Sequence, residues 1–130
     1  MAPMLLTQMV ARQMVEKKIK GSIINISSIS GLRPYQNRAA HSTAKAALIM
    51  LTKSCTLELG KFNIRVNAIA PGSTPYDSSG EGFVTEGIPL VRTGTPKDQA
   101  NAAAVFLASD DSSWMTGHTM VVDGGQSLCI

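Results

Sequence analysis

The sequence of 130 residues offers few groups for metal binding or disulfide formation. Cys55 and Cys129 are its two cysteines; they form no CxxC pair, and no histidine lies at metal-ligand spacing from them. These absences argue against a zinc site and a disulfide framework, and they favour a reducing compartment. We therefore predict a cytoplasmic protein without a metal centre.

The sequence also lacks the segments that direct a chain to a membrane or a nucleic acid. No run approaches the roughly 18 uncharged apolar residues of a bilayer span, and the first residues lack a signal-peptide pattern. Charged residues make up 16%, with 12 Lys and Arg against 9 Asp and Glu. The basic cluster Lys17, Lys18 and Lys20 is typical of a solvated helix end. We expect neither a membrane nor a nucleic-acid partner.

What is present is enough apolar material, 44% of the residues, for one packed domain. Apolar residues recur at helical spacing from Met4 to Ile19, with Gly21 as the expected stop signal. A second helical pattern runs from Ala39 to Leu59, and Gly60 ends it. Its predicted apolar face comprises Ala44, Leu48, Leu51, Cys55 and Leu59. A third helix should begin at the cap Thr95, with Pro96 and Asp98 in its first turn, and run to about Ala108.

Three short apolar runs rich in β-branched residues alternate with these helices and predict strands. They are Ser22–Ser27, Ile64–Ala70 and Thr119–Val122. The first two are joined by a crossover of the length that connects parallel strands. Residues Ser73–Thr93 are polar and rich in Gly, Ser and Pro, with weak helical character near 81–86, and they predict a mobile loop or lid over a substrate.

This order predicts an α/β chain with a three-stranded parallel sheet, or half of a doubly wound one. The first strand is apolar at successive positions, as if buried on both faces, yet no other strand precedes it. It would leave a bare edge with no charge or proline between Ser22 and Ser28. No GxGxxG loop is present either. We therefore interpret residues 1–130 as the C-terminal part of a larger Rossmann-type sheet.

Several segments together resemble the C-terminal half of a short-chain dehydrogenase/reductase. Gly21–Ser28 resembles the strand that ends in the family's catalytic serine, and Asn67–Gly72 resembles the strand and PG turn beside the nicotinamide. The family's usual ending is matched by Phe106–Asp110, Thr116–His118 and Val122–Gly125. The resemblance implies NAD(P)(H)-dependent hydride transfer between a small-molecule alcohol and a carbonyl. It covers nearly the whole chain, but the family's dinucleotide-binding glycines would belong upstream of Met1.

The family's catalytic spacing is retained with one change of residue. A Ser lies thirteen residues before position 41, and a Lys four residues after it, so Ser28 and Lys45 carry over as substrate polariser and ribose anchor. Position 41 is His41 where the family has Tyr. A neutral imidazole could still relay a proton, or His41 is a polar residue tolerated where catalysis has been lost. Tyr35 lies on a loop and cannot take the role.

The resemblance places the remaining cofactor contacts, to NAD or NADP, at Lys45, Pro71, Gly72, Ser73 and Thr74. Pro75 removes one amide donor beside Thr74. The resemblance also implies a homo-oligomer, formed through helices 4–19 and 39–59. The alternative from another class is a truncated, non-catalytic relative that acts as an interaction module, and a third reading is a fragment without function.

Other polar residues have simpler interpretations. We expect Ser27 to point away from Ser28 and to be structural, because side chains alternate along a strand. Asn25 and Asn67 should hydrogen-bond neighbouring segments, and His118 should lie at the surface. Asp123 should form a turn that positions the C-terminal residues.

Overall fold

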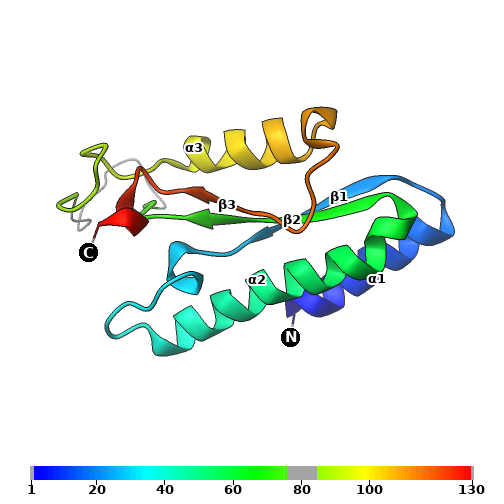
Figure 1. The fold of residues 1–130 in the computed structure, drawn as a ribbon, viewed down its shortest axis with the longest axis horizontal. Coiled ribbons are helices and arrows are strands. Elements are labelled where there is room, and N and C mark those ends of the chain that lie inside the picture. Colours follow the sequence, from blue (N-terminus) through cyan, green and yellow to red (C-terminus); the bar gives the residue numbers. More distant parts are fainter. Residues whose placement is uncertain (1, 76–84, 130) are drawn as a thin grey trace.

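A computed structural model describes residues 2–75 and 85–129 as a three-layer α/β arrangement (Figure 1). The sheet has three parallel strands in the order β1-β2-β3. Helices α1 and α2 cover one face, and α3 with the segment that follows it covers the other. The element bounds are α1 Ala2–Glu16, β1 Gly21–Ile26, α2 Ala39–Leu59, β2 Ile64–Pro71, α3 Pro96–Ala100 and β3 Thr119–Val122. The predicted parallel sheet is thus confirmed.

The core is centred on β2, the middle strand. Ile64, Val66, Ala68, Ile69 and Ala70 are all essentially inaccessible to solvent. A central parallel strand is covered on both faces, which explains its nearly continuous apolar sequence. By contrast β1 is hydrogen-bonded on one side alone within the described residues, and it is only half-buried. The bare edge expected from the sequence is therefore present.

The first helix ends earlier than expected, and by a different signal. It stops at Glu16, and the left-handed residue that turns the chain is Lys18, with φ 52°. Gly21 is instead the first residue of β1. The Met14 sulfur would lie 2.6 Å from a Cβ at Gly21, so the glycine permits the helix end to pack against the strand. The prediction that Gly21 ends the helix is therefore wrong; this glycine lies at the start of β1, against Met14.

The apolar face predicted for α2 is only partly the buried one. Ile49 and Thr52 are its buried residues, whereas Ala44 is exposed and the other predicted positions are half-buried. Thr52 tolerates complete burial because its hydroxyl donates to the Leu48 carbonyl at 2.9 Å and accepts from Asn25 Nδ2 at 3.0 Å. A threonine whose hydroxyl is hydrogen-bonded locally can therefore occupy a buried helix position, and a search for apolar residues at helical spacing does not detect it.

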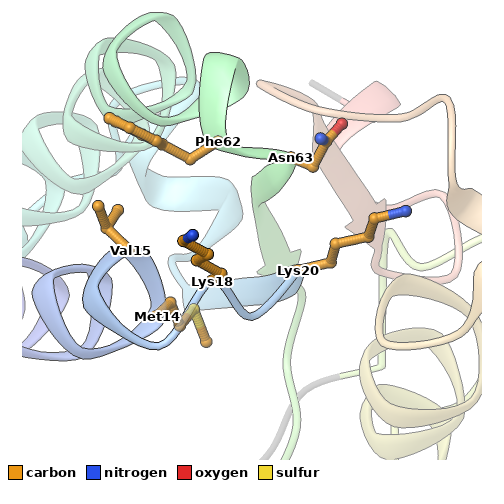
Figure 2. Close-up of a pocket in the computed structure, with 6 residues that line it drawn as sticks. All are labelled: Met14, Val15, Lys18, Lys20, Phe62 and Asn63. Carbon is orange, nitrogen blue, oxygen red and sulfur yellow. The ribbon is translucent and has the colours of Figure 1, made fainter.

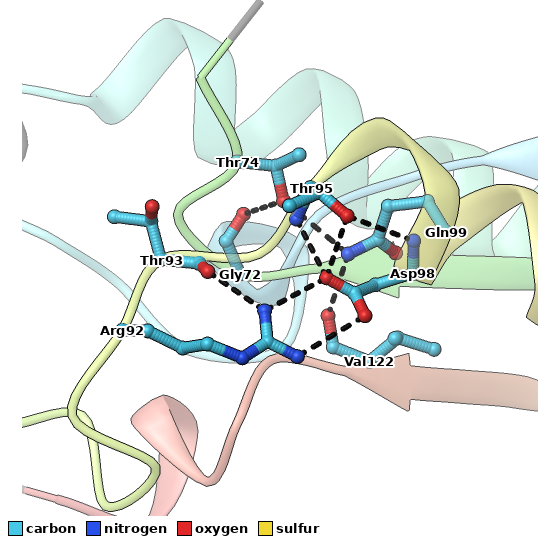
Figure 3. A network of polar contacts seen from close by, with 8 residues as sticks. All are labelled: Gly72, Thr74, Arg92, Thr93, Thr95, Asp98, Gln99 and Val122. Atoms are coloured by element: carbon cyan, nitrogen blue, oxygen red, sulfur yellow. Dashed lines mark hydrogen bonds and ion pairs between the residues drawn. The ribbon is translucent and has the colours of Figure 1, made fainter. Parts of the chain in front are cut away.

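The third helix begins as predicted but changes its winding. Thr95 Oγ1 accepts the Asp98 N–H at 3.2 Å, and Asp98 accepts the Thr95 N–H at 2.7 Å, which forms a reciprocal capping box (Figure 3). Helix α3 itself is five residues long, and Asn101–Leu107 continues it as a π-helical segment. The predicted end near Ala108 is confirmed, whereas the helical pattern did not predict the wider π-helical winding.

We expect the Asp98 carboxylate to contribute stability that disappears in acid. The Arg92 guanidinium at 2.8 Å, followed by the Thr95 N–H and hydroxyl, holds the pKa of Asp98 well below its usual range. A lowered folded-state pKa stabilises the chain above the unfolded pKa of about 3.9, and the contribution is lost as the pH falls toward the folded value.

Thermal unfolding of wild type and Asp98→Asn across the acid range measures this contribution. The wild type should unfold at the higher temperature near neutrality, and the difference should shrink steadily below about pH 4. Asp110→Asn changes an exposed carboxylate outside the network and serves as the control. A difference between wild type and Asp98→Asn that does not depend on pH would contradict the assignment.

Among residues 2–75 and 85–129, no helix combines the length and apolarity that crossing a bilayer requires.

Candidate active site

The carboxyl ends of the three strands meet at one edge of the sheet, at the left of Figure 1. There β1 continues into Ser27 and Ser28, β2 into Gly72 and Ser73, and β3 into Asp123. Open parallel sheets bind ligands at this edge, in the crevice outside the strand ends. The residues singled out from the sequence are therefore gathered on the appropriate side of the sheet.

Lys45 is fixed to the end of β1 by two hydrogen bonds in opposite directions. Its ammonium donates to the Ile26 carbonyl at 2.8 Å, and its own carbonyl accepts the Ser27 hydroxyl at 2.9 Å. Ser27 is buried and donates its backbone N–H to the Ile69 carbonyl at 2.7 Å. The structural interpretation of Ser27 is therefore confirmed. An ammonium has three donors, so two remain at Lys45 for a ligand once its contacts with residues 2–75 and 85–129 are counted.

Gly31 brings the serine turn onto α2 at the same point. A Cβ at Gly31 would lie 2.7 Å from the Lys45 carbonyl carbon and 2.9 Å from the Ala46 nitrogen. These are backbone atoms, which cannot move aside as a flexible side chain can. Only glycine permits this approach, so Gly31 sets the separation between the short 3-10 turn Ile29–Gly31 and the Lys45 turn of α2.

Ser28 has an extended backbone and caps the Ile29–Gly31 turn. Its Oγ accepts the Ser30 N–H at 3.1 Å, and the residue is half-buried. A hydroxyl that accepts one bond still carries its proton. Ser28 can therefore donate to a substrate oxygen without breaking its structural contact.

His41 lies on the first turn of α2 and is exposed. Helical spacing places it on the same side of α2 as Lys45, one turn earlier. It lines an open surface pocket of about 410 Å³ with Asn37, Arg38, Ala39 and Ala40. The neighbouring Ser42 hydroxyl is buried and has no hydrogen-bond partner in the part of the chain that the structure describes. Position 41 is thus accessible to solvent and to small molecules.

Ser73 is held by a residue far along the chain. Gln126 accepts the Ser73 N–H at 2.8 Å through Oε1 and donates to Ser73 Oγ at 2.9 Å through Nε2. The Ser73 hydroxyl accepts this bond, so its proton remains available. Gly72 lies under the same turn, because a Cβ there would be 2.7 Å from the Asp123 Cβ and 2.8 Å from Gln126 Oε1.

Thr74 is more fully occupied than Ser73. Its hydroxyl donates to the Gly72 carbonyl at 3.3 Å and accepts from Gln99 Nε2 at 3.2 Å (Figure 3). Gln99 Nε2 also donates to the Val122 carbonyl at 3.0 Å, which links α3 to both β2 and β3. Because the Thr74 hydroxyl already donates its proton to the Gly72 carbonyl, it has none to donate to a ligand.

Asp123 forms the turn expected of it. Its carboxylate accepts the Gly125 N–H at 2.9 Å and the Ser127 N–H at 2.6 Å. Burial disfavours the charged carboxylate, but hydrogen bonds from Ser127 and Gly125 outweigh burial and keep the pKa of Asp123 below its ordinary value. The charged turn holds Gln126 against Ser73.

The remaining sequence interpretations concern residues away from this edge. Asn67 is fully buried; it donates to the Met115 carbonyl at 2.9 Å and accepts the His118 N–H at 3.0 Å. Asn25 donates to Thr52 on α2, and His118 is exposed. All three are structural or surface residues, as predicted.

The residues of this edge fit a nicotinamide dinucleotide in part. Lys45 offers two free donors on a fixed ammonium, and Ser73 retains a hydroxyl proton, so both suit the hydroxyl and amide oxygens of such a ligand. The Thr74 hydroxyl proton is already donated to the Gly72 carbonyl, so Thr74 could contact the ligand only by packing. The Asp123 turn packs directly against Gly72. Gly31, Gln99 and Gln126 were missed from the sequence, because their roles depend on contacts between distant segments.

Comparison with known proteins defines the class. Residues 1–127 match the family described as enoyl-(acyl carrier protein) reductase. The chain is 39% identical to L-xylulose reductase of Caenorhabditis elegans over 96% of its length, and 44% identical to a 3-oxoacyl-[acyl-carrier-protein] reductase of Chlamydia trachomatis over 91%. A solved structure of 4-hydroxyisoleucine dehydrogenase complexed with NADH has a TM-score of 0.90, with 39% identity over 99% of this chain.

The chain belongs to the short-chain dehydrogenase/reductase family, a class of oxidoreductases. Its three-stranded sheet is a partial Rossmann-like sheet of that class. The chain covers 53% of the L-xylulose reductase, 49% of the Chlamydia trachomatis reductase and 56% of the 4-hydroxyisoleucine dehydrogenase. It therefore spans about half the length of these relatives.

Proposed function

We propose that this chain contributes the substrate side of an NAD(P)(H)-dependent alcohol–carbonyl oxidoreductase site. The observation that carries the proposal is the Lys45 ammonium, fixed at 2.8 Å to the end of β1 while Ser28 follows two residues later on the same strand end. NAD or NADP would supply or accept the hydride when bound. The names of the relatives support a small-molecule alcohol or carbonyl substrate.

Each residue has a role that its local contacts allow. Ser28 keeps its hydroxyl proton and can donate it to the substrate oxygen, which polarises a carbonyl or orients an alcohol. Lys45 would hold the ribose hydroxyls with its two remaining donors. His41, accessible on the same side of α2, would exchange a proton with the substrate oxygen as a neutral imidazole. Pro71, Gly72, Ser73 and Thr74 would form the wall beside the nicotinamide.

The segment Ser73–Thr93 would select the substrate. Residues 76–84, including part of the predicted helical stretch, lie outside the described residues. The segment is anchored beyond them: Ile88 is buried, and the Leu90 N–H donates to the Gly124 carbonyl at 3.2 Å. This attachment to the Asp123 turn would keep residues 88–90 beside the strand ends.

A fluorescence titration of the 130-residue chain with NADH and NADPH tests the proposal. We expect saturable binding that Lys45→Ala weakens by about tenfold or more, because a hydrogen bond from a charged group contributes about 1.5–3 kcal/mol. Lys53→Ala removes an exposed lysine two turns further along α2 and is the matched control. His41→Tyr, assayed for turnover beside the parent chain, reports what the imidazole contributes.

The competing proposal is a non-catalytic module that joins related subunits. It is favoured by the apolar surface of α1, where Met4, Leu5, Leu6 and Met9 are each more than half exposed. Exposed apolar residues of this kind mark contact surfaces, and the homo-oligomer expected through helices 4–19 and 39–59 would use them. Light scattering during the titration separates the two. An oligomer that binds no cofactor at millimolar concentration would overturn the enzyme proposal in favour of the module.

A further inference from the structure

A second pocket lies at the opposite edge of the sheet from the candidate active site. It is formed where α1 ends and where β1 and β2 begin, and it has a volume of about 230 Å³ (Figure 2). Its lining residues are Met14, Val15, Lys18, Lys20, Phe62 and Asn63. None of them belongs to the site described above.

The pocket carries positive charge that the described residues do not neutralise. Lys18 and Lys20 are exposed, and neither forms an ion pair within residues 2–75 and 85–129. No carboxylate is among the lining residues. A negative group introduced here would therefore approach two exposed lysines of the pocket rim without having to displace an ion-pair partner among the described residues.

The carbonyls at the end of α1 do not account for these lysines. Lysines often lie near a helix carboxyl end because its free carbonyls carry partial negative charge. Here the backbone N–H groups of residues 17–19 already donate to the carbonyls of Gln13, Val15 and Met14, at 2.8–3.1 Å. The ammonium groups are left exposed to solvent at the rim of the pocket.

Two lining residues are held in an unusual backbone conformation. Lys18 has φ 52° and Asn63 has φ 58°, both in the left-handed region. Asparagine adopts this region readily, but a lysine there is uncommon and costs conformational energy. The two left-handed residues place Lys18 and the Asn63 amide at the mouth of one pocket, although they lie far apart in the sequence.

The other walls of the pocket are apolar. Met14 packs so closely on Gly21 that a Cβ there would lie 2.6 Å from its sulfur. Val15 and Phe62 lie on the side of the pocket away from Lys20, and Phe62 is 42% exposed. An apolar wall beside two ammonium groups suits a ligand with an anionic head and a compact apolar body.

We propose that this pocket binds a small organic anion, a phosphate or carboxylate on a ring-sized apolar group, through Lys18, Lys20, Asn63 and the Phe62 wall. The volume of about 230 Å³ admits a ligand of that size. The proposed site lies outside the hydride-transfer site and does not depend on it.

The probe is phenyl phosphate, titrated into the isotopically labelled 130-residue chain and followed by amide NMR shifts. We expect saturable shifts centred on residues 14–20 and 62–63. The double variant Lys18→Gln with Lys20→Gln should weaken binding by about tenfold, and added salt should weaken it in the parent chain. Phe62→Ala should weaken phenyl phosphate more than inorganic phosphate, because inorganic phosphate does not use the apolar wall.

The matched control is Lys53→Gln with Lys97→Gln, which removes the same charge from exposed positions outside the pocket. Benzoate and benzyl alcohol test the head group; the neutral alcohol should not bind measurably. The proposal is overturned if shifts do not saturate by about 50 mM, or if the control lowers affinity as much as the pocket variant. Lys45→Ala should leave phenyl phosphate binding unchanged, so failure of the active-site proposal would be distinguishable.

Discussion

Replacement of Gly31 by alanine is expected to destabilise the chain by about 1–3 kcal/mol and to loosen the Lys45 turn. The new methyl group would lie 2.7 Å from the Lys45 carbonyl carbon and 2.9 Å from the Lys45 carbonyl oxygen. Both atoms belong to the helix backbone, so the Ile29–Gly31 turn must move away from α2. Urea unfolding measures the loss, and the amide shift of Lys45 reports the displacement.

Gly60→Ala is the matched control for this change. Gly60 has φ −55° and ψ −38°, a helical conformation, and a Cβ there would meet no atom within 4 Å. Alanine should therefore be neutral at this position, or stabilising by up to about 1 kcal/mol. A Gly31→Ala variant as stable as the parent chain would show that the turn and the helix are not in the close contact described.

A still larger loss, about 2–4 kcal/mol, is expected from Asn67→Ala. Asn67 is completely buried in β2, and its amide binds both the Met115 carbonyl and the His118 N–H. Removing it leaves the part-buried Met115 carbonyl and His118 N–H without their partner and creates a cavity in β2. The connection that leads into β3 should loosen as a result, so hydrogen exchange at His118 should accelerate along with the shift in urea midpoint.

Asn101→Ala provides the comparison, since Asn101 is exposed in the segment that follows α3. It should change the unfolding free energy by no more than about 0.5 kcal/mol. If Asn67→Ala were equally mild, the two amide hydrogen bonds would not be what holds the 115–118 connection to β2.

The regular elements were predictable because their determinants are local. Period-3.6 and short β-branched patterns identified α2, β2 and β3 to within about two residues, and Thr95-Pro96 identified the start of α3. The parallel sheet followed from the length of the crossover between β1 and β2. The structure holds the Lys45 ammonium at Ile26, the end of β1 and two residues before Ser28, whereas the joint catalytic role of Ser28, His41 and Lys45 stays a prediction from the family spacing.

The supporting contacts were not predictable because they join distant parts of the chain. Gln126 and Ser73 are separated by 53 residues, and Gln99 and Thr74 by 25. No local pattern records that a glutamine amide will bind a particular turn. The close approach of Gly31 to Lys45 is of the same kind, since the glycine has no side chain and its importance lies entirely in what it allows nearby.

The contrast between positions 41 and 45 bears on how this sequence could change over evolutionary time. Lys45 contacts the Ile26 carbonyl through its ammonium, whereas its contacts with Ser27 and Gly31 use backbone atoms, so a replacement there would lose one side-chain hydrogen bond to the end of β1. His41 is exposed and lines an open pocket, so the fold imposes little selection on it. Histidine and tyrosine codons differ by one base. A change of His41 to tyrosine would therefore need a single base substitution, and the exposed position offers it room without a change in the scaffold.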